Sequence, residues 1–452
     1  MVLFAASAAL PAVAAAQQAR PNILIIVTDD QRAANTMGVM PQTLRYFRGG
    51  GRQFTNAFAT TPLCCPSRAT SLTGRYAHNT GVRQNRPDGL DRSTLFPRLL
   101  RRAGYRTAMA GKFLNRFRGR PPYFERSARL LRLLQGAYVD PLFMVDGDIR
   151  RQTGYSTTLI GQYARRFLRS FEGDDAAPWF LYLAPVAPHH PWTPAPRYTR
   201  SPLPRWSGNP AVFERDRSDK PPYVRTLHFT RADAQIVRAG QLRTLMSVDE
   251  MVGRLVATLE DLGEKRDTLA IFTSDNGYLW ADHAFGGDFG TAGEKRVPYT
   301  ASVQVPFFLR WPGRVPRRSR DDRLVGNVDI APTVLSAARI APDPAKPPLD
   351  GRSLLAPGRR GRMLLEYWKE RGQPIPTWAS LRTRRYQYIE YYTSDGRRSF
   401  REYYNLVRDR WQLRNLLGDA RAANDPNVRR LQARLARDRR CAGRGASPRP
   451  CP

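Results

Sequence analysis

The sequence predicts an α/β protein, with a doubly wound sheet that has helices on both faces and a smaller C-terminal domain with an antiparallel sheet. Three observations predict this class. Between residues 21 and 316, short apolar runs of the buried-strand type alternate with helical stretches. Residues 232–262 carry the apolar spacing of one long amphipathic helix. Beyond residue 351, runs rich in aromatic and β-branched residues flank a Ser-Asp-Gly turn, which is typical of an antiparallel hairpin.

The individual elements follow from the same patterns. The strands expected in the large sheet are residues 22–28, 106–110, 179–184, 268–273 and 306–310. The arms of the expected hairpin are residues 380–392 and 399–406, and the arginine-rich tail after residue 420 can hold a helix. Because 452 residues are too many for one small core, we expect a large domain over residues 21–350 and a smaller one over residues 351–452.

The first 20 residues are expected to lie outside these domains, as a signal peptide or a disordered N-terminus. They form an alanine-rich apolar run with small-residue cleavage sites just before Gln17, as secretory signals do. No Lys or Arg precedes Arg20, so the basic start of a typical signal is missing. No later run approaches the length of a membrane-spanning helix. The sequence therefore predicts a secreted or periplasmic protein without stable membrane insertion.

The formal net charge of +34 suits an anionic partner, which can be a nucleic acid, a membrane surface or an acidic substrate. The excess is spread along the whole chain and is mostly arginine. Since the sequence has no zinc-finger, RRM or KH signature, we expect no nucleic-acid partner. A solvated basic surface and a polyanion-binding surface both stay open, and the oligomeric state is not predicted.

The four cysteines form two pairs in the sequence. Cys441 and Cys451 can close a small loop in the tail, which fits an oxidising compartment. Cys64 and Cys65 are adjacent and badly placed to bridge each other, because a disulfide requires a larger separation of the two Cα atoms. The second pair therefore needs another role.

Polar residues follow four of the expected strands, at the edge where an open α/β sheet binds its ligands. They are Asp29 and Asp30, Lys112, His189, and Asp275 and Asn276. The carboxylate and amide oxygens among them suit a hard cation such as Ca²⁺ or Mg²⁺ better than zinc. Taken singly, Asp-Asp after a strand is often a helix cap and Asp-Asn-Gly a turn. Their shared position favours a metal site.

The most specific local pattern is Cys-Cys-Pro-Ser-Arg at residues 64–68, followed by Thr-Gly-Arg at residues 73–75. Pro66 and Ser67 are typical first residues of a helix, which places Cys64 at its electropositive end, where an anion is favoured. The alternative is a pair of small buried cysteines. A protease-type thiolate would need a histidine base, and no spacing in the sequence suggests one.

This pattern resembles the signature of the type I, formylglycine-dependent sulfatases of the alkaline phosphatase superfamily, whose first cysteine is oxidised before or during export. Further segments follow in sulfatase order, namely residues 21–31, 111–112, 187–189, 273–277, Lys295 before 305–307, and 403–417. The resemblance thus covers nearly the whole chain. The variants Cys-Cys-Pro-Ser-Arg, Gly-Lys-Phe-Leu-Asn and Pro-His-His-Pro-Trp are similar to those of N-acetylglucosamine-6-sulfatases and related heparan sulfatases.

The resemblance implies an alkaline-phosphatase-like sheet and a nucleophile made by a formylglycine-generating enzyme from Cys64. Hydrated formylglycine would attack the sulfur of a sulfate ester, and its second hydroxyl would then expel sulfate. The implied cofactor is Ca²⁺, with Mg²⁺ as the alternative. Its implied ligands are Asp29, Asp30, Cys64 as formylglycine, Asp275 and Asn276.

The resemblance implies further catalytic residues around the nucleophile. Arg68 would hold the hydrated formylglycine. Lys112 and Lys295 would neutralise the sulfate oxygens, and His189 would donate a proton to the leaving alcohol. The expected substrate is a sulfated small molecule or polysaccharide, above all a sulfate ester of a sugar or glycosaminoglycan.

Two positions depart from the family pattern. Many sulfatases have a histidine where this chain has Leu114, so no base for sulfate release is assigned, although Asn115 resembles the glucosamine-6-sulfatase form. Those enzymes also have a histidine at the position of Leu279. His283 is the nearby candidate for that role, and the alternative is that His283 only caps structure. Two other functions stay open: a phosphate or phosphonate ester hydrolase of the same superfamily, and an inactive basic polyanion-binding protein in which Cys64 is never oxidised.

Overall fold

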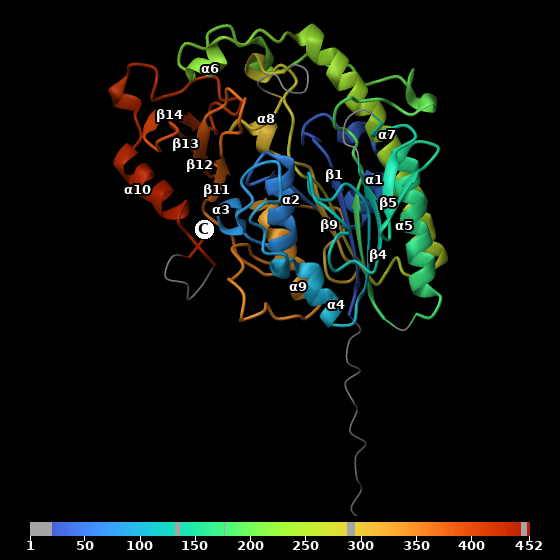
Figure 1. Ribbon diagram of the computed structural model, residues 1–452. Coiled ribbons are helices and arrows are strands. Elements are labelled where there is room, and N and C mark those ends of the chain that lie inside the picture. The colour runs from blue at the N-terminus through green and yellow to red at the C-terminus, as the bar shows by residue number, and fades with distance from the viewer. Residues whose placement is uncertain (1–19, 132–135, 176, 287–293, 444–449) are drawn as a thin grey trace, which may run out of the picture.

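The computed structural model of the protein describes residues 20–131, 136–175, 177–286, 294–443 and 450–452 (Figure 1). The signal peptide or disordered segment expected over residues 1–20 lies outside the described residues except for Arg20. Within the described ranges, no helix is both long and apolar enough to cross a membrane. Two sheets organise this part of the chain, one of ten strands and one of four.

The large sheet has a parallel centre, antiparallel pairs on both sides of that centre and one parallel pair at an edge. Its strands are β1 Asn22–Thr28, β2 Arg52–Phe58, β3 Arg106–Gly111, β4 Arg126–Leu130, β5 Leu142–Val145, β6 Asp148–Arg151, β7 Trp179–Ala184, β8 Thr268–Ser274, β9 Phe307–Arg310 and β10 Ser319–Gly326. They lie in the order β10-β2-β9-β8-β1-β7-β3-β4-β5-β6. The run from β8 to β4 is parallel, whereas β9 and β5 are each antiparallel to both neighbours.

Helices cover both faces of this sheet (Figure 1). The longer helices are α2 Cys64–Thr73, α4 Phe96–Arg102, α5 Ser156–Glu172, α7 Arg231–Asp261, α9 Ile330–Ala337 and α10 Val428–Asp438. Single turns form α1 Pro41–Thr43, α3 Ala77–Thr80, α6 Pro222–Arg225 and α8 Thr300–Val303. The arrangement confirms the doubly wound architecture that the sequence predicts.

The alternation of β1 shows why both faces need a cover. Leu24 and Ile26 point into the core beneath α5 and α7, whereas Ile23, Ile25 and Val27 point into the core beneath α2, α4 and α9. Every residue of the strand is buried. A strand that is apolar on both faces is stable only between two layers of helices.

The five expected strands are all present, each within one residue of its expected bounds, and α7 is the long helix expected over residues 232–262. The sequence did not predict β2, β4, β5, β6, β10 or α5. β10 and β6 are the two edges of the sheet, and all residues of β6 are exposed. A strand with so little buried surface carries no apolar alternation to mark it.

The smaller sheet is antiparallel, as expected, with strands β11 Met363–Tyr367, β12 Thr377–Arg382, β13 Tyr386–Tyr392 and β14 Arg398–Asn405 in that order. The Ser-Asp-Gly turn joins β13 to β14, which confirms the hairpin. The single arm expected over residues 380–392 is wrong, because Thr383 Oγ1 accepts hydrogen bonds from the backbone nitrogens of Arg385 and Tyr386 and closes a turn there. The domain boundary at residue 350 stays a prediction.

The C-terminal tail is tied back to the large domain. α10 packs on β12, and the expected disulfide joins Cys441 to Cys451 beyond it. His78 Nε2 donates to the Cys441 carbonyl oxygen at 2.9 Å, and the Gly443 nitrogen donates to Asp350 Oδ1 at 2.6 Å. These contacts join segments that lie far apart in the sequence.

Candidate active site

The polar residues that follow the strands meet at one edge of the large sheet. β8, β1, β7 and β3 are parallel neighbours, so their carboxyl ends lie side by side. This edge collects Asp29, Asp30, Lys112, His189, Asp275 and Asn276. Two more side chains come from α2 and one from the segment before α8; these are Cys64, Arg68 and Lys295. All nine of these residues are buried.

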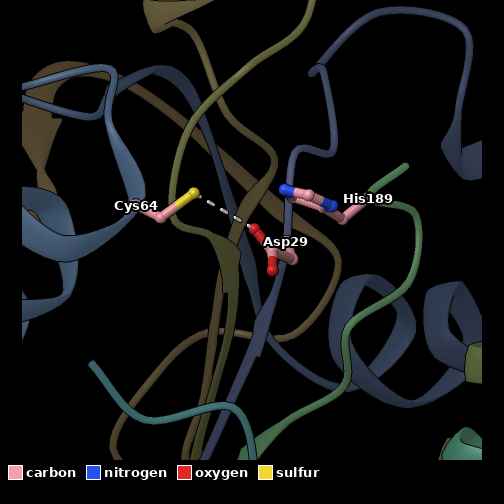
Figure 2. A group of neighbouring side chains, drawn as sticks. All are labelled: Asp29, Cys64 and His189. Atoms are coloured by element: carbon pink, nitrogen blue, oxygen red, sulfur yellow. Dashed lines mark hydrogen bonds between the residues drawn. The ribbon is translucent and has the colours of Figure 1, made fainter. Parts of the chain in front are cut away.

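Cys64 is the first residue of α2, and its side chain lies among charged groups. Its Sγ is 3.5 Å from Asp29 Oδ1 and 3.2 Å from the Nζ of Lys295. Figure 2 shows Cys64 and His189 on either side of Asp29. The helix begins here because Leu63 is extended and Pro66 lies in the first turn, where its missing N–H costs nothing. Position 64 is therefore at the positive end of a helix.

The thiol of Cys64 is poorly suited to act as a thiolate. Burial raises its pKa above the ordinary value, and Lys112 and Lys295 offset only part of that rise. A cysteine nucleophile needs a lowered pKa, so an unmodified Cys64 is protonated in this environment.

Two lysines bind the aspartates that follow β1. Lys112 Nζ donates to Asp29 Oδ2 at 2.5 Å, and Lys295 Nζ donates to Asp30 Oδ1 at 2.5 Å. Burial alone would raise the pKa of Asp30, but Lys295, His189 and Lys112 hold it well below its usual range. In the same way, burial would lower the pKa of each lysine, and the carboxylates raise it instead. Both lysines therefore keep their positive charge.

Arg68 spans the aspartates that follow β1 and β8. Its Nε donates to Asp275 Oδ2 at 2.8 Å, and its Nη2 lies 3.8 Å from Asp29 Oδ2. Its Nη1 donates to the backbone oxygen of Lys112 at 3.1 Å. Nη2 is buried and has no hydrogen-bond partner among the described residues, so it can serve a ligand.

Five residues fit a divalent cation. The possible ligand atoms of Asp29, Asp30, Cys64 and Asp275 all lie within 4.8 Å of one another. Asn276 Nδ2 donates to Asp30 Oδ1 at 2.7 Å, while its Oδ1 is buried without a hydrogen-bond partner among the described residues. A buried acceptor without a donor beside converging carboxylates is the oxygen-rich arrangement that a hard cation prefers.

The charge balance of this cluster also favours a cation. Burial and the neighbouring Asp29 raise the pKa of Asp275 to about 6, although Arg68 and Lys112 oppose the rise. Repulsion between buried carboxylates is therefore only partly compensated by the side chains present. A divalent cation would relieve it.

His189 faces the carboxylates from the side of β7. Its Nδ1 donates to the backbone oxygen of His190 at 2.7 Å, and its Nε2 lies 3.8 Å from Asp30 Oδ2. Tyr138 donates to the backbone oxygen of His189 at 2.5 Å. Burial lowers the pKa of His189 to about 4, with Lys112 adding to the effect and Asp30 opposing it. An anionic ligand beside Nε2 would raise that pKa.

A cavity of about 520 Å³ opens beside His189. Its walls are Gln84, Asn85, Arg86, Asn115, Arg116, His189, Arg296, Glu370, Arg371 and Gln373. Glu370 joins two parts of this wall, because its carboxylate binds Arg296 Nε at 3.2 Å and accepts from the backbone nitrogen of Asn85 at 3.0 Å. Of these residues, the sequence singled out only His189 and Asn115. Of the other lining residues, only Arg296 could have been found from the sequence, because it directly follows the candidate catalytic residue Lys295.

His283 does not join this group. Its Nδ1 lies 2.6 Å from Glu214 Oε2, and both side chains are buried. A structural role, in which His283 pairs with Glu214, therefore describes this residue better than a catalytic role. Leu114 and Leu279, which replace family histidines, are buried in two separate apolar clusters.

Comparison with known proteins places this geometry in a family. The model for the Sulfatase family matches residues 21–340, and the model for the C-terminal part of N-sulphoglucosamine sulphohydrolase matches residues 287–440. A solved structure described as a complex with its substrate D-glucosamine-2-N,6-O-disulfate has a TM-score of 0.76 and 25% identity, and the match covers 92% of this chain and 97% of that chain.

Two curated relatives illustrate the range of similar sequences. The extracellular sulfatase SULF-1 homologue of Drosophila melanogaster is 33% identical over 365 residues, which cover 75% of this chain and 31% of that protein. The N-acetylglucosamine-6-sulfatase of Homo sapiens is 29% identical over 501 residues, which cover 95% of this chain and 86% of that protein. This chain thus spans about a third of the first protein and most of the second. The chain belongs to the sulfatase family.

Proposed function

We propose that the protein is a sulfuric ester hydrolase that acts on sugar sulfates with a formylglycine made from Cys64 and a divalent cation. The observation that carries the proposal is the position of Cys64. Its side chain lies at the N-terminus of α2, within 3.5 Å of Asp29 and 3.2 Å of Lys295, in a chain of the sulfatase family. A formylglycine-generating enzyme would act on the chain before this site closes around residue 64.

The position of Cys64 supports a modified nucleophile over a cysteine nucleophile. Burial raises the pKa of the Cys64 thiol, and the hydrogen bonds of its Sγ join it to Asp29, Asp30 and Lys295. Formylglycine would supply two hydroxyl groups when hydrated, one to attack sulfur and one to release sulfate. Arg68 Nη2 makes no hydrogen bond among the described residues and would hold the hydrated group, and Lys295 contacts the same position.

The cation would be held by Asp29, Asp30, Asp275, Asn276 and residue 64. It would lower the pKa of the nucleophilic oxygen and offset the charge of the sulfate group. We propose Ca²⁺, with Mg²⁺ as the alternative, because all the protein ligands are oxygens. The orphaned Oδ1 of Asn276 supports this ligand set.

The remaining charged residues would act on the sulfate group. Lys112 and Lys295 keep their charge in the buried site, so they can neutralise the sulfate oxygens as negative charge develops in the transition state. His189 is the candidate proton donor to the leaving alcohol. Its pKa of about 4 without substrate makes that role depend on the bound anion, which would favour the protonated imidazole.

The cavity beside His189 supports a sulfated sugar as the substrate. Its four arginines outnumber its single glutamate, so it favours a ligand with more than one anionic group. The similar solved structure holds a sulfated glucosamine, and the human relative is an N-acetylglucosamine-6-sulfatase. We propose a 6-O-sulfated glucosamine within a glycosaminoglycan-like chain, acted on outside the cytoplasm after export.

Sulfate release from matched substrates tests this function. The enzyme, coexpressed with a formylglycine-generating enzyme, should release sulfate from glucosamine 6-sulfate and from an aryl sulfate. Paired aryl sulfate, aryl phosphate and phosphonate esters should show a preference for sulfate in kcat/KM. A preference for phosphate or phosphonate would show that the protein is a phosphate or phosphonate ester hydrolase instead. Turnover of aryl sulfate but of no sugar sulfate would contradict the carbohydrate substrate and leave the sulfatase activity standing.

A further inference from the structure

Arg382 is a buried arginine whose charge no carboxylate balances. It is the last residue of β12 and is 7% exposed. In the described part of the chain, no carboxylate lies within ion-pair distance of it, and burial lowers its pKa to about 9. A buried cation without a carboxylate beside it is costly to keep out of water, so an anion that joins it is favoured.

The hydrogen bonds of Arg382 leave one side of its guanidinium unused. Nη1 donates to Thr300 Oγ1 at 3.0 Å and to Gln387 Oε1 at 2.6 Å. Nε is buried without a partner among the described residues, and Nη2 makes no hydrogen bond within them either. The guanidinium also lies over the Phe58 ring, 4.8 Å from the ring centre. Nη2 is therefore the N–H group left to donate to an oxygen of an oxyanion in the cavity.

Arg382 lines a cavity of about 350 Å³ between the two sheets. Thr300, Arg410, Trp411 and Gln412 also line it, and the Arg410 guanidinium lies 4.7 Å from the centre of the Trp411 ring. The volume is in the range of small-molecule sites. A partly exposed aromatic ring beside polar groups gives a sugar ring a surface on which to pack.

The acidic group of this cavity is already neutralised. Asp282 binds Arg32, another lining residue, at 2.9 Å, so these two side chains together add no net charge to the cavity. Arg384, another lining residue, pairs with Asp322 outside the cavity wall. Arg382 and Arg410 therefore leave the cavity with an excess of positive charge, which favours an anionic ligand over a neutral one.

We propose that this cavity binds one saccharide unit that carries an oxyanion, with its carboxylate or sulfate group against Arg382 and its ring on Trp411. The cavity is separate from the cleft beside His189, since the two share no lining residue. Binding there needs no turnover, so the proposal holds or fails independently of the sulfatase reaction.

Isothermal titration of the whole protein carrying Cys64→Ala, which cannot release sulfate, tests the proposal with four probes: glucuronate, glucosamine 6-sulfate, glucose and sodium sulfate. Glucuronate and glucosamine 6-sulfate distinguish a carboxylate from a sulfate group. Glucose tests the sugar ring without an oxyanion, and sodium sulfate tests the oxyanion without a sugar ring. The variants are Arg382→Gln and Trp411→Ala. Arg385→Gln, an exposed arginine three residues along that does not line the cavity, is the matched control for lost charge.

At least one charged sugar should bind, with glucose and sodium sulfate weaker by about tenfold or more. Arg382→Gln and Trp411→Ala should each weaken binding of that sugar by about tenfold, and turnover of a small aryl sulfate by either variant in protein that keeps Cys64 should stay within about twofold. The proposal is wrong if both variants bind like the Arg385→Gln control. Equal binding of sodium sulfate and the charged sugars would overturn the saccharide part. If Arg382→Gln does not fold, Trp411→Ala decides the question alone.

Discussion

Lys295 Nζ lies 3.2 Å from Cys64 Sγ and 2.5 Å from Asp30 Oδ1, so one ammonium group contacts both the candidate nucleophile and a candidate metal ligand. The contact is buried, and the carboxylates keep the pKa of Lys295 above its usual value. A fixed positive charge at that point can stabilise negative charge that develops on sulfate or on the nucleophile.

Replacing this charge should slow the reaction. Lys295→Met should lower kcat/KM for an aryl sulfate by on the order of a hundredfold or more, because one preorganised donor to the transition state is lost. The control is Lys265→Met, since Lys265 is a partly exposed lysine that pairs with Glu260 and lies outside the site. Initial-rate kinetics with both variants measure the effect. Equal kcat/KM values for the two variants would show that Lys295 has no role in the reaction.

Metal dependence follows from the ligand set around Asp275. Prolonged treatment with a chelator should abolish hydrolysis, and Ca²⁺ should restore it. Asp275→Asn should lose on the order of a hundredfold in activity and most of the rise in melting temperature that Ca²⁺ causes in the unchanged protein. Asp343→Asn is the control, since Asp343 is a partly buried carboxylate that pairs with Arg98 and does not belong to the candidate metal site. Full activity of the stripped Asp275→Asn protein would contradict a metal site here.

The centre of the fold could be predicted from the sequence, and its edges could not. Strands such as β1 and β7 are apolar throughout and lie between two helical layers, so their composition marks them. β6, at the sheet edge, is exposed along its whole length, and β10 is largely polar. Their pairing depends on neighbours brought close by the rest of the fold, which no local pattern records.

His78 supplies a test of stability against pH. Its Nδ1 lies 2.9 Å from Glu366 and its Nε2 faces the Cys441 carbonyl oxygen, so both nitrogens donate. Burial would lower the pKa of His78, but Glu366 and these hydrogen bonds raise it to about 9, from 6.5 in an exposed histidine. A raised histidine pKa stabilises the fold fully below pH 6.5, and this contribution is lost as the pH rises through about 9.

The expected size of the His78 contribution is about 3.5 kcal/mol at most, from about 1.4 kcal/mol per pKa unit. Denaturant unfolding at pH 6 and pH 9.5 should therefore show a loss of stability that His78→Asn reduces. His228→Asn, an exposed histidine, should keep the loss seen in the unchanged protein. An identical pH dependence in His78→Asn and His228→Asn would show that the ion pair with Glu366 contributes nothing.

The arginines of the cleft make a prediction about substrate capture. If Arg86, Arg116 and Arg371 attract a sulfated chain, kcat/KM on a long sulfated polysaccharide should fall more steeply with ionic strength than kcat/KM on an aryl sulfate. Arg371→Gln should flatten the polysaccharide curve and leave the aryl sulfate unchanged. Released sulfate at matched pH is the readout. Parallel curves for the two substrates would exclude electrostatic capture of a polyanion.

As with the fold, one part of the candidate site could be predicted from the sequence and another part could not. Residues next to strands, such as Asp29 and Asp275, were predicted to meet because parallel strands end at one edge. Glu370 and Arg296 form part of the cleft wall only because the segment after β11 folds over the large domain, and no spacing in the sequence joins them. His283 shows the opposite case, since the sequence brought it near the site and its pairing with Glu214 accounts for it.

The central claim is that residue 64 becomes formylglycine while Cys65 does not. Both side chains are buried, but only Cys64 contacts Asp29 and Lys295, whereas Cys65 Sγ faces the backbone oxygen of Asn115. Mass spectrometry of the peptide that holds both residues, from exported protein coexpressed with a formylglycine-generating enzyme and after aldehyde trapping, tests the claim directly. The account predicts an aldehyde at position 64 and a thiol at position 65; an aldehyde at position 65, or none at either position, would contradict it.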